Sequence, residues 1–96
     1  MVDATKEDRL RLYKAILSLE TQEECEDFFE DLLTIAEMNA ACQRLKVAVL
    51  LDQKITTQKI AQETGASTAT VTRVNKCLNY GKGYKNIVKK LNDNEE

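Results

Sequence analysis

The chain has 96 residues, with 14 basic and 16 acidic side chains, three Cys, no His and no Pro. This length predicts one domain over residues 1–96 with a small core. Without His, and without a G-x-S-x-G or Walker-type loop, most hydrolytic and phosphoryl-transfer machinery is excluded, so we expect no enzyme. The absence of His and of a C-x-x-C pair also argues against a metal site or a disulfide framework. Cys25, Cys42 and Cys77 are therefore predicted to be small core residues.

Two further properties of the chain bear on its location and partners. It has no run of 18 apolar residues and no signal-like N-terminus, so we expect a cytoplasmic protein with no membrane partner. Its charge is divided unevenly, because residues 1–33 carry a net charge of −6 and residues 34–92 a net charge of +7. The basic C-terminal part is where a polyanion would be held.

The N-terminal third predicts two helices. Leu10, Tyr13 and Leu17 form an apolar stripe at helical spacing, which indicates a first helix over about residues 5–19. The motif Thr21-Gln-Glu-Glu24 is a capping box, which predicts the start of a second helix. That helix has a single apolar face, made of Cys25, Phe28, Phe29, Leu32 and Leu33.

A third helix is predicted from a second capping box, Thr34-Ile-Ala-Glu37, to about Asp52. Its later part, "LKVAVLL", is apolar nearly all round, and such a helix is normally enclosed on every side. Because a 96-residue chain has few elements to enclose it, we expect a homodimer built on this helix. A central core helix of a monomer is the alternative.

The C-terminal half predicts two short helices and a final one. Thr56 or Thr57 caps a helix that ends near Thr64, and Ser67 or Thr68 caps a helix to about Leu78. The final helix covers about residues 84–92. We therefore expect residues 5–54 to form the dimerisation core, residues 55–79 a helix-turn-helix, and the final helix to complete the core.

The segment "TQKIAQETGASTATVTRV", residues 57–74, has the pattern of a helix-turn-helix. Ala61 is small enough for two helices to cross closely, and Gly65 tolerates a left-handed backbone in the turn. The inward contacts should fall at Ile60, Thr64, Ala66, Val71 and Val74, and these positions are apolar or semi-apolar.

With Val71, Val74 and Leu78 facing inward, the opposite face of this unit is rich in hydroxyls and ends in cations. Hydroxyls and small residues at the start of a helix can reach base edges in the major groove of DNA, and cations can bind guanine or phosphate. The predicted base-reading residues are Ser67, Thr68, Ala69, Thr72, Arg73 and Lys76, and Thr57, Gln58 and Lys59 are predicted to contact the DNA backbone. A helical hairpin whose polar face is only solvated is the alternative.

The stretches "LLTIAEMNAACQRLKVAVLL" and "IAQETGASTATVTRVNKCLNYG" resemble the Trp repressor superfamily, and most closely its YerC/YecD-type branch. The resemblance covers about residues 5–92. It implies an all-α fold of six helices in which two chains intertwine as a homodimer. It also implies a sequence-specific DNA-binding transcription regulator, a repressor, whose helix from Ser67 enters the major groove.

The resemblance also implies a small-molecule corepressor site. In tryptophan-binding members the indole lies between two arginines, which map onto Arg44 and Arg73, with Thr34 near the amino group. Guanidinium planes stack on aromatic faces, so this arrangement is physically sound. However, Val74 stands where those members have Gly, and Cys77 replaces a hydroxyl, which speaks against tryptophan. Another small effector, or none, and a phosphate contact or intersubunit ion pair for Arg44, are the alternatives.

A second hypothesis for the function comes from a different class. Helix-turn-helix units are not all DNA readers, and this one could be a protein-interaction adaptor whose acidic first 33 residues dock a basic partner. Substitution of Arg73 and Lys76 would separate the two hypotheses, because only the DNA reader needs those cations for its binding.

Overall fold

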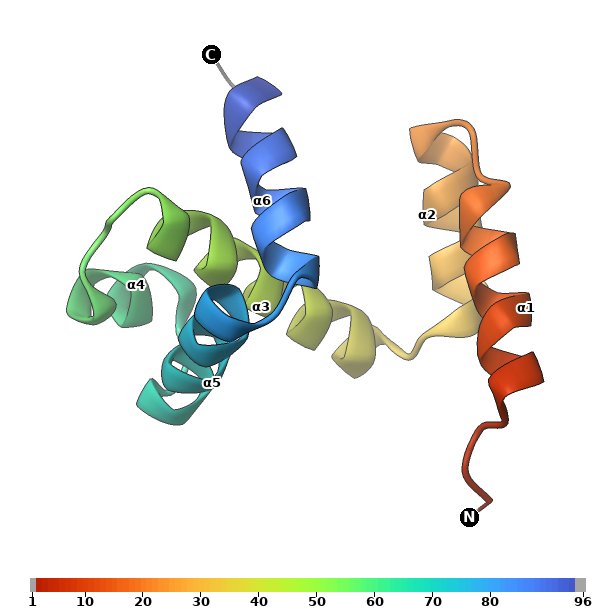
Figure 1. Cartoon of the computed structure of the whole chain (residues 1–96), viewed down its shortest axis with the longest axis horizontal. Helices are drawn as coiled ribbons and strands as arrows, with labels where there is room; N and C mark the ends of the chain where they lie inside the picture. The colour runs from red at the N-terminus through yellow and green to blue at the C-terminus, as the bar shows by residue number, and fades with distance from the viewer. Residues whose placement is uncertain (1, 95–96) are drawn as a thin grey trace. The chain divides into compact units, whose positions relative to one another are not determined.

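The computed structural model describes residues 2–94, and within these residues the chain is entirely helical, with no strand. This confirms the predicted all-α fold of six helices (Figure 1). The helices are α1 (Lys6–Leu17), α2 (Gln22–Leu32), α3 (Ile35–Asp52), α4 (Thr57–Thr64), α5 (Thr68–Tyr80) and α6 (Gly83–Asn94). None of them is both long and apolar enough to cross a membrane, as far as the described residues go.

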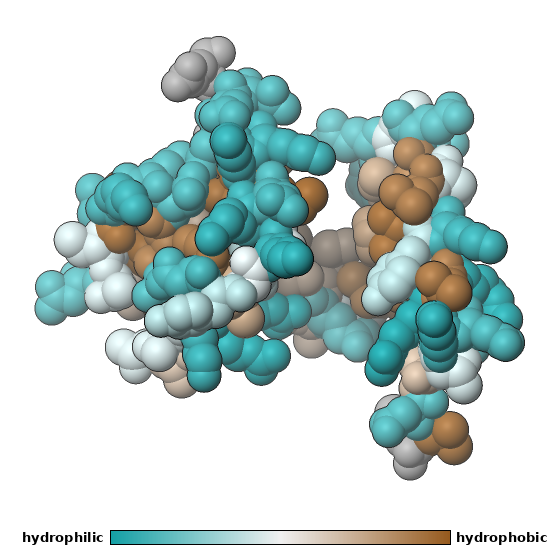
Figure 2. Space-filling model, in the orientation of Figure 1, coloured by the Kyte–Doolittle hydropathy of each residue, from teal (hydrophilic) through white to brown (hydrophobic). Residues whose placement is uncertain are grey.

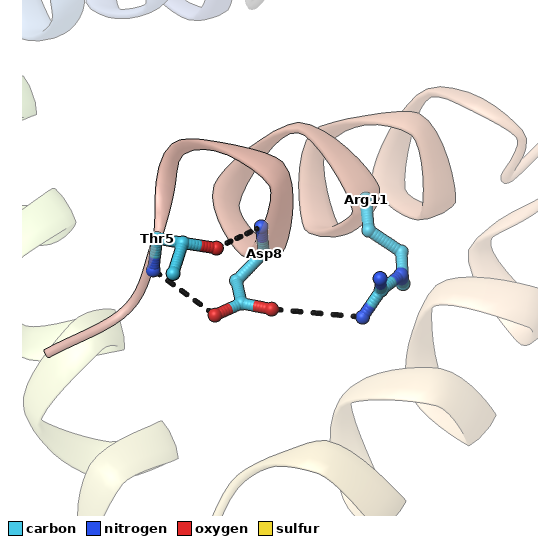
Figure 3. Close-up of polar contacts among 3 residues, drawn as sticks. All are labelled: Thr5, Asp8 and Arg11. Carbon is cyan, nitrogen blue, oxygen red and sulfur yellow. Dashed lines mark hydrogen bonds and ion pairs between the residues drawn. The ribbon is translucent and has the colours of Figure 1, made fainter. Parts of the chain in front are cut away.

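Reciprocal hydrogen bonds fix the beginning of α1. The Thr5 hydroxyl accepts the N–H of Asp8 at 3.1 Å, and the Asp8 carboxylate accepts the N–H of Thr5 at 3.0 Å (Figure 3). The same carboxylate lies 3.7 Å from the guanidinium of Arg11. Both hydrogen bonds to Thr5, the backbone one first, hold the pKa of Asp8 below its ordinary value. The predicted start of this helix is correct, although its capping box was not predicted.

The capping box predicted at Thr34 and Glu37 is confirmed. The Glu37 carboxylate accepts the Thr34 N–H at 2.9 Å, and the Thr34 hydroxyl accepts the Glu37 N–H at 3.1 Å. The backbone hydrogen bond from Thr34, followed by the side-chain one, lowers the pKa of Glu37. A carboxyl group whose pKa is lowered by folding stabilises the fold at pH values above its ordinary pKa. This contribution is lost as the pH falls through the lowered pKa.

The box predicted at Thr21 is only half correct. The Thr21 hydroxyl accepts the Glu24 N–H at 3.1 Å, as expected for an N-cap. The Glu24 carboxylate, however, accepts the N–H of Glu20 at 2.7 Å and not that of Thr21. Thr21 itself has the extended backbone usual for an N-cap, with φ −128° and ψ 160°.

The chain divides into two compact units, residues through Met38 and residues from Asn39 onward. In the first unit, no side chain of residues 2–38 is fully buried. Its apolar residues remain largely accessible: Tyr13 is 53% exposed, Leu17 83% and Ile35 83%. Figure 2 shows brown, apolar side chains at the surface of the α1 and α2 segment. The first unit therefore has no core of its own.

The second unit contains the hydrophobic core. Helices α3, α4, α5 and α6 and the α4–α5 turn all contribute to it, through the buried side chains Val47, Ala48, Ile60, Ala66, Val71, Val74 and Val88. Leu78 is also buried, so the predicted inward face of α5 is correct. Val47 and Ala48 are 0% exposed, whereas Leu45, two residues earlier, is 37% exposed. One chain thus encloses much of the apolar part of α3 that was expected to require a partner.

The prediction that all three cysteines are core residues was wrong for the single chain. Cys42 and Cys77 are exposed and Cys25 is half-buried. Cys77 lies between the buried Val74 and Leu78 in sequence, but its own position on α5 turns it away from the core. A preference of the residue type for burial does not determine which face of a helix a residue occupies.

Side-chain hydrogen bonds join α6 to the C-terminal end of α3. The Asn92 amide donates to the Asp52 carboxylate at 2.7 Å, and the Gln53 amide donates to the Asn92 side-chain oxygen at 2.9 Å. This bridge supports two further residues of helix beyond the predicted end at residue 92. The α5 helix likewise runs to Tyr80, two residues beyond the prediction, and ends at Gly81, whose N–H donates to the Cys77 carbonyl at 2.8 Å.

Lys54, in the turn between α3 and α4, has a positive φ of 66°. A left-handed backbone is strained for a residue with a Cβ, whereas Gly adopts it freely. We expect Lys54→Gly to raise the free energy of unfolding by about 0.5 kcal/mol, in urea titrations at fixed protein concentration, because the relief of strain exceeds the entropy that Gly adds to the unfolded chain. Lys54→Ala, which keeps the Cβ, is the control and should gain nothing. A gain in stability of the same size in both variants would show that the gain does not come from relief of backbone strain at Lys54.

Candidate nucleic-acid interface

Two capped helices and a left-handed turn form the helix-turn-helix. The Thr56 hydroxyl accepts the N–H of Lys59 at 3.2 Å at the start of α4, and the Ser67 hydroxyl accepts the N–H of Thr70 at 3.1 Å at the start of α5. Between the helices, Gly65 has φ 72° and ψ 5°, the left-handed conformation predicted for it. Of the two cap candidates at the start of each helix, Thr56 and Ser67 are the caps in the structure.

Thr64 holds the turn between the two helices. Its hydroxyl donates to the Ile60 carbonyl at 2.7 Å and accepts the Ala66 N–H at 3.1 Å. The Thr64 carbonyl accepts the side-chain amide of Gln43, on α3, at 3.1 Å. Thr64 was predicted at the inward face, but Gln43 was not predicted to contact it, because a contact between residues 21 apart leaves no local pattern in the sequence.

Removal of the Gln43 side chain tests this attachment. We expect Gln43→Ala to lower the free energy of unfolding by about 1 kcal/mol, because the half-buried Thr64 carbonyl loses its hydrogen-bond donor. Hydrogen exchange should also accelerate at the amides of Gly65 and Ala66 in the turn. Gln62→Ala, an exposed amide on α4, is the matched control and should change stability by less than about 0.5 kcal/mol. Equal losses in the two variants would contradict the role of Gln43.

The two helices enclose a groove of about 340 Å³. The α4 side of this groove is formed by Thr57, Gln58, Ala61 and Gln62, and the α5 side by Thr68, Val71 and Thr72. Ala61, which was predicted to permit a close crossing of the two helices, is part of the groove lining. Four of the nine predicted DNA-binding residues line the groove: Thr57, Gln58, Thr68 and Thr72. All nine are exposed, and the five outside the groove are Lys59, Ser67, Ala69, Arg73 and Lys76.

From the last residue of α4 to Asn92 the charged side chains have one sign, whereas α4 also carries the exposed Glu63. Residues 64–92 contain six basic side chains and no acidic one. Arg73 and Lys76, on α5, are both exposed. Within residues 2–94 the one ion pair is that between Asp8 and Arg11, so no described carboxylate neutralises either cation. The exposed side of the helix-turn-helix therefore attracts anions.

The residues predicted to bind an effector, Thr34, Arg44 and Arg73, are all exposed. Thr34 belongs to the first unit, and Arg44 and Arg73 belong to the second. An apolar hollow of about 470 Å³ in the second unit includes neither arginine and is lined by Leu45, Cys77, Gly81, Gly83, Tyr84 and Ile87. Cys77, expected near the effector, is in this hollow. Among residues 2–94, no group of three His, Cys, Asp or Glu side chains is placed to hold a metal ion.

Comparison with known proteins assigns the chain to a family. The model of the Trp repressor protein family matches residues 8–92. The uncharacterized protein YerC of Bacillus subtilis (strain 168) is 55% identical over 71 residues, which are 74% of this chain and 68% of YerC.

Two solved structures are similar to the whole fold. The crystal structure of a TrpR-like protein from Eubacterium eligens has a TM-score of 0.83 at 46% identity and covers 92% of this chain and 91% of its own. A protein proposed to be a Trp repressor, from Staphylococcus aureus, has a TM-score of 0.81 at 41% identity, with coverage of 93% and 96%. The chain therefore belongs to the Trp repressor protein family.

Proposed function

We propose that this protein is a cytoplasmic, dimeric, sequence-specific DNA-binding transcription regulator, and that it acts as a repressor. Membership of a family of regulators fits this function and gives no reason to expect an enzyme. The observation that carries the proposal is the exposed, hydroxyl-rich start of α5, which lies in a carboxylate-free stretch of 29 residues from Thr64 to Asn92 and shares a groove with the polar start of α4. A face that only solvates a helix is normally rich in both Glu and Lys.

In the proposed complex α5 enters the major groove with its N-terminal end. Thr68, Ala69 and Thr72 contact base edges, since hydroxyls donate or accept hydrogen bonds and a methyl group packs on thymine. Arg73 and Lys76 bind guanine or phosphate further along the helix. Thr57, Gln58 and Lys59, at the start of α4, contact the DNA backbone and set the register of the protein on the duplex.

The accessible apolar surface supports the proposed homodimer. The first unit has no fully buried side chain among residues 2–38, and Leu45 and Ile87 in the hollow of the second unit are 37% and 48% exposed. Exposed apolar patches of this kind mark surfaces that bind another protein. We propose that an intertwined second copy covers them, with residues 5–54 and α6 in the dimer core. Two-fold symmetry then presents two reading helices about 34 Å apart.

Selection from a pool of randomised duplexes, with and without free tryptophan, tests the function. We expect enrichment of a near-palindromic motif whose half-sites lie one helical turn apart, with an affinity that falls steeply as salt rises. Tryptophan should not change the enriched motif or its affinity, because Val74 is 1% exposed and packed in the core. A tryptophan-dependent affinity would instead support a corepressor site formed by Thr34, Arg44 and Arg73.

One outcome of the duplex selection would contradict the proposed DNA-binding function. If no motif is enriched at concentrations where weak, salt-sensitive binding is detected, the attraction to DNA is only that of a basic surface for a polyanion. The adaptor hypothesis, in which the acidic first unit docks a basic protein, would then take its place. Repression itself is tested by placing the enriched motif across a promoter and measuring transcription with and without the protein.

A further inference from the structure

Tyr80 is an exposed aromatic side chain that is not among the predicted DNA contacts. It is the last residue of α5, and 85% of its surface is accessible. Because this helix was predicted to end near Leu78, Tyr80 was not assigned to any face of it. Tyr is enriched at surfaces that meet a partner, since its ring is apolar and its hydroxyl forms hydrogen bonds.

The structure fixes the end of α5 directly after Tyr80. The Gly81 N–H donates to the Cys77 carbonyl at 2.8 Å and closes the last turn of the helix. Gly81 approaches this carbonyl so closely that a Cβ would lie 2.7 Å from its oxygen, which a residue with a side chain could not accommodate without a shift. Beyond this point the chain turns into α6, which runs in another direction (Figure 1). The direction of Tyr80 from the helix axis therefore follows from the helical period.

That period places Tyr80 on the outer side of α5. Four exposed residues of the helix are spaced by four, three and four positions, which aligns them along one side: Ala69, Arg73, Lys76 and Tyr80. We call these four residues the outer line of α5. The buried side chains of the helix belong to its opposite side. Since the first three members of the line are predicted to bind DNA, Tyr80 extends the same surface by one more turn.

The length of the outer line decides what Tyr80 would meet on a duplex. About 16 Å of helix separate Tyr80 from Ala69, at 1.5 Å per residue. The major groove is only about 12 Å wide, so a helix that enters it with its N-terminal end has left the bases before Tyr80 is reached. The phosphates of the DNA strand border the groove there. An anion is favoured at this end of α5, because Lys82 is exposed and no acidic side chain occurs from Thr64 to Asn92.

We propose that the Tyr80 hydroxyl donates a hydrogen bond to a DNA phosphate at the edge of the major groove, once in each half-site. Tyr is among the side chains that hydrogen-bond DNA phosphates, and such contacts fix the register of a protein without reading the sequence. Tyr80 is then a positioning residue, which sets how far α5 enters the groove. A phosphate is favoured over a second copy of the chain, because the neighbours of Tyr80 on the outer line are the cations Arg73 and Lys76. The inference rests on the DNA-binding function proposed above.

Removal of the hydroxyl alone tests this contact. We expect Tyr80→Phe to lower the affinity for the enriched duplex at least about tenfold in fluorescence anisotropy titrations, because each half-site loses a hydrogen bond to a charged acceptor. A duplex with altered half-sites should lose affinity by the same factor, since phosphates carry no sequence information. The slope of log affinity against log salt should not change, because the lost group carries no charge. Tyr13→Phe, at a 53% exposed position of the first unit, is the matched control and should bind as wild type does.

Duplexes with single neutral phosphates locate the contact. Each phosphate of the enriched duplex is replaced in turn by a methylphosphonate, and the affinities of wild type and Tyr80→Phe are compared. At one position in each half-site the replacement should weaken wild type at least about fivefold more than it weakens the variant, because the variant has already lost its partner there. A variant that acted only through the fold would be weakened as much as wild type at every position.

Several outcomes would overturn the role of Tyr80. Unchanged affinity in Tyr80→Phe, or an equal loss in Tyr13→Phe, would show that the hydroxyl of Tyr80 does not contact DNA. A loss confined to the enriched motif would indicate a contact with a base. A higher dimer dissociation constant for Tyr80→Phe in sedimentation equilibrium would assign the hydroxyl to a contact between copies. If wild type itself selects no motif, the proposed DNA-binding function fails, which is a separate result.

Discussion

The double substitution Arg73→Ala and Lys76→Ala is expected to lower the affinity for the enriched duplex at least about 100-fold, while the helix content stays unchanged. Both side chains are exposed, so their removal leaves no cavity and no unpaired buried group. A base contact from an Arg is worth about 1–3 kcal/mol, and a dimer presents each side chain twice. If Lys76 binds phosphate, its loss should also reduce the slope of log affinity against log salt by about two units for the dimer.

The control for this prediction removes two exposed cations from the other unit. Lys6 and Lys14, on α1, have the same total charge as the tested pair and lie outside the helix-turn-helix. Their double Ala variant should bind within about threefold of wild type in fluorescence anisotropy titrations at fixed salt, because exposed charges that do not contact the DNA are screened. Equal losses in the two double variants would show that net charge, and not the face of α5, determines binding.

Ile60→Ala is expected to lower the free energy of unfolding by about 3 kcal/mol, within the range for buried Ile or Leu truncations. Ile60 is 0% exposed and belongs to the core cluster together with Val47, Val71, Val74 and Val88. Its position on α4 makes it the side chain that anchors this helix to the core. Because a domain of this size is stabilised by only about 5–15 kcal/mol, the variant should lose a large share of its stability and unfold at a lower temperature.

A graded series makes the measurement specific. Ile60→Val should cost about 1 kcal/mol, since it removes one methyl group, and Glu63→Ala on the exposed face of α4 should cost less than about 0.5 kcal/mol. Urea titrations must be compared at one protein concentration, because association of chains would add to the apparent stability. A loss below about 1 kcal/mol for Ile60→Ala would mean that the helix-turn-helix does not depend on this contact.

The features that sequence predicted well are local ones. The Thr34 and Glu37 capping box, the left-handed Gly65 and the inward Val71 and Val74 depend on residues within a few positions of one another, so the spacing alone carried the information. The exposure of all nine predicted DNA-binding residues follows from the same helical periodicity. Their roles remain a proposal, because an exposed hydroxyl has the same geometry whether it meets water or a base.

The features that sequence did not predict depend on which elements meet. Gln43 contacts Thr64 and Asn92 contacts Asp52, at separations of 21 and 40 residues, and no periodicity links such pairs. The burial of Val47 was expected, but its enclosure by the other helices of the same chain was not, because helix packing decides which elements cover an apolar side chain. Lys54 adopts a left-handed backbone at a position where a Gly would have signalled it.

The start of α5 is already ordered before it meets any partner. The Ser67 hydroxyl accepts the Thr70 N–H at 3.1 Å and lies 3.0 Å from the Thr70 hydroxyl, within hydrogen-bonding distance. Thr68, Thr70 and Thr72 are β-branched, which restricts their first side-chain torsion in a helix. Binding would therefore freeze few rotamers at this face, in contrast to a face of Lys, Arg and Gln. A preordered surface of this kind gains affinity when its target already has the complementary shape. It cannot adapt its own shape to a mismatched target.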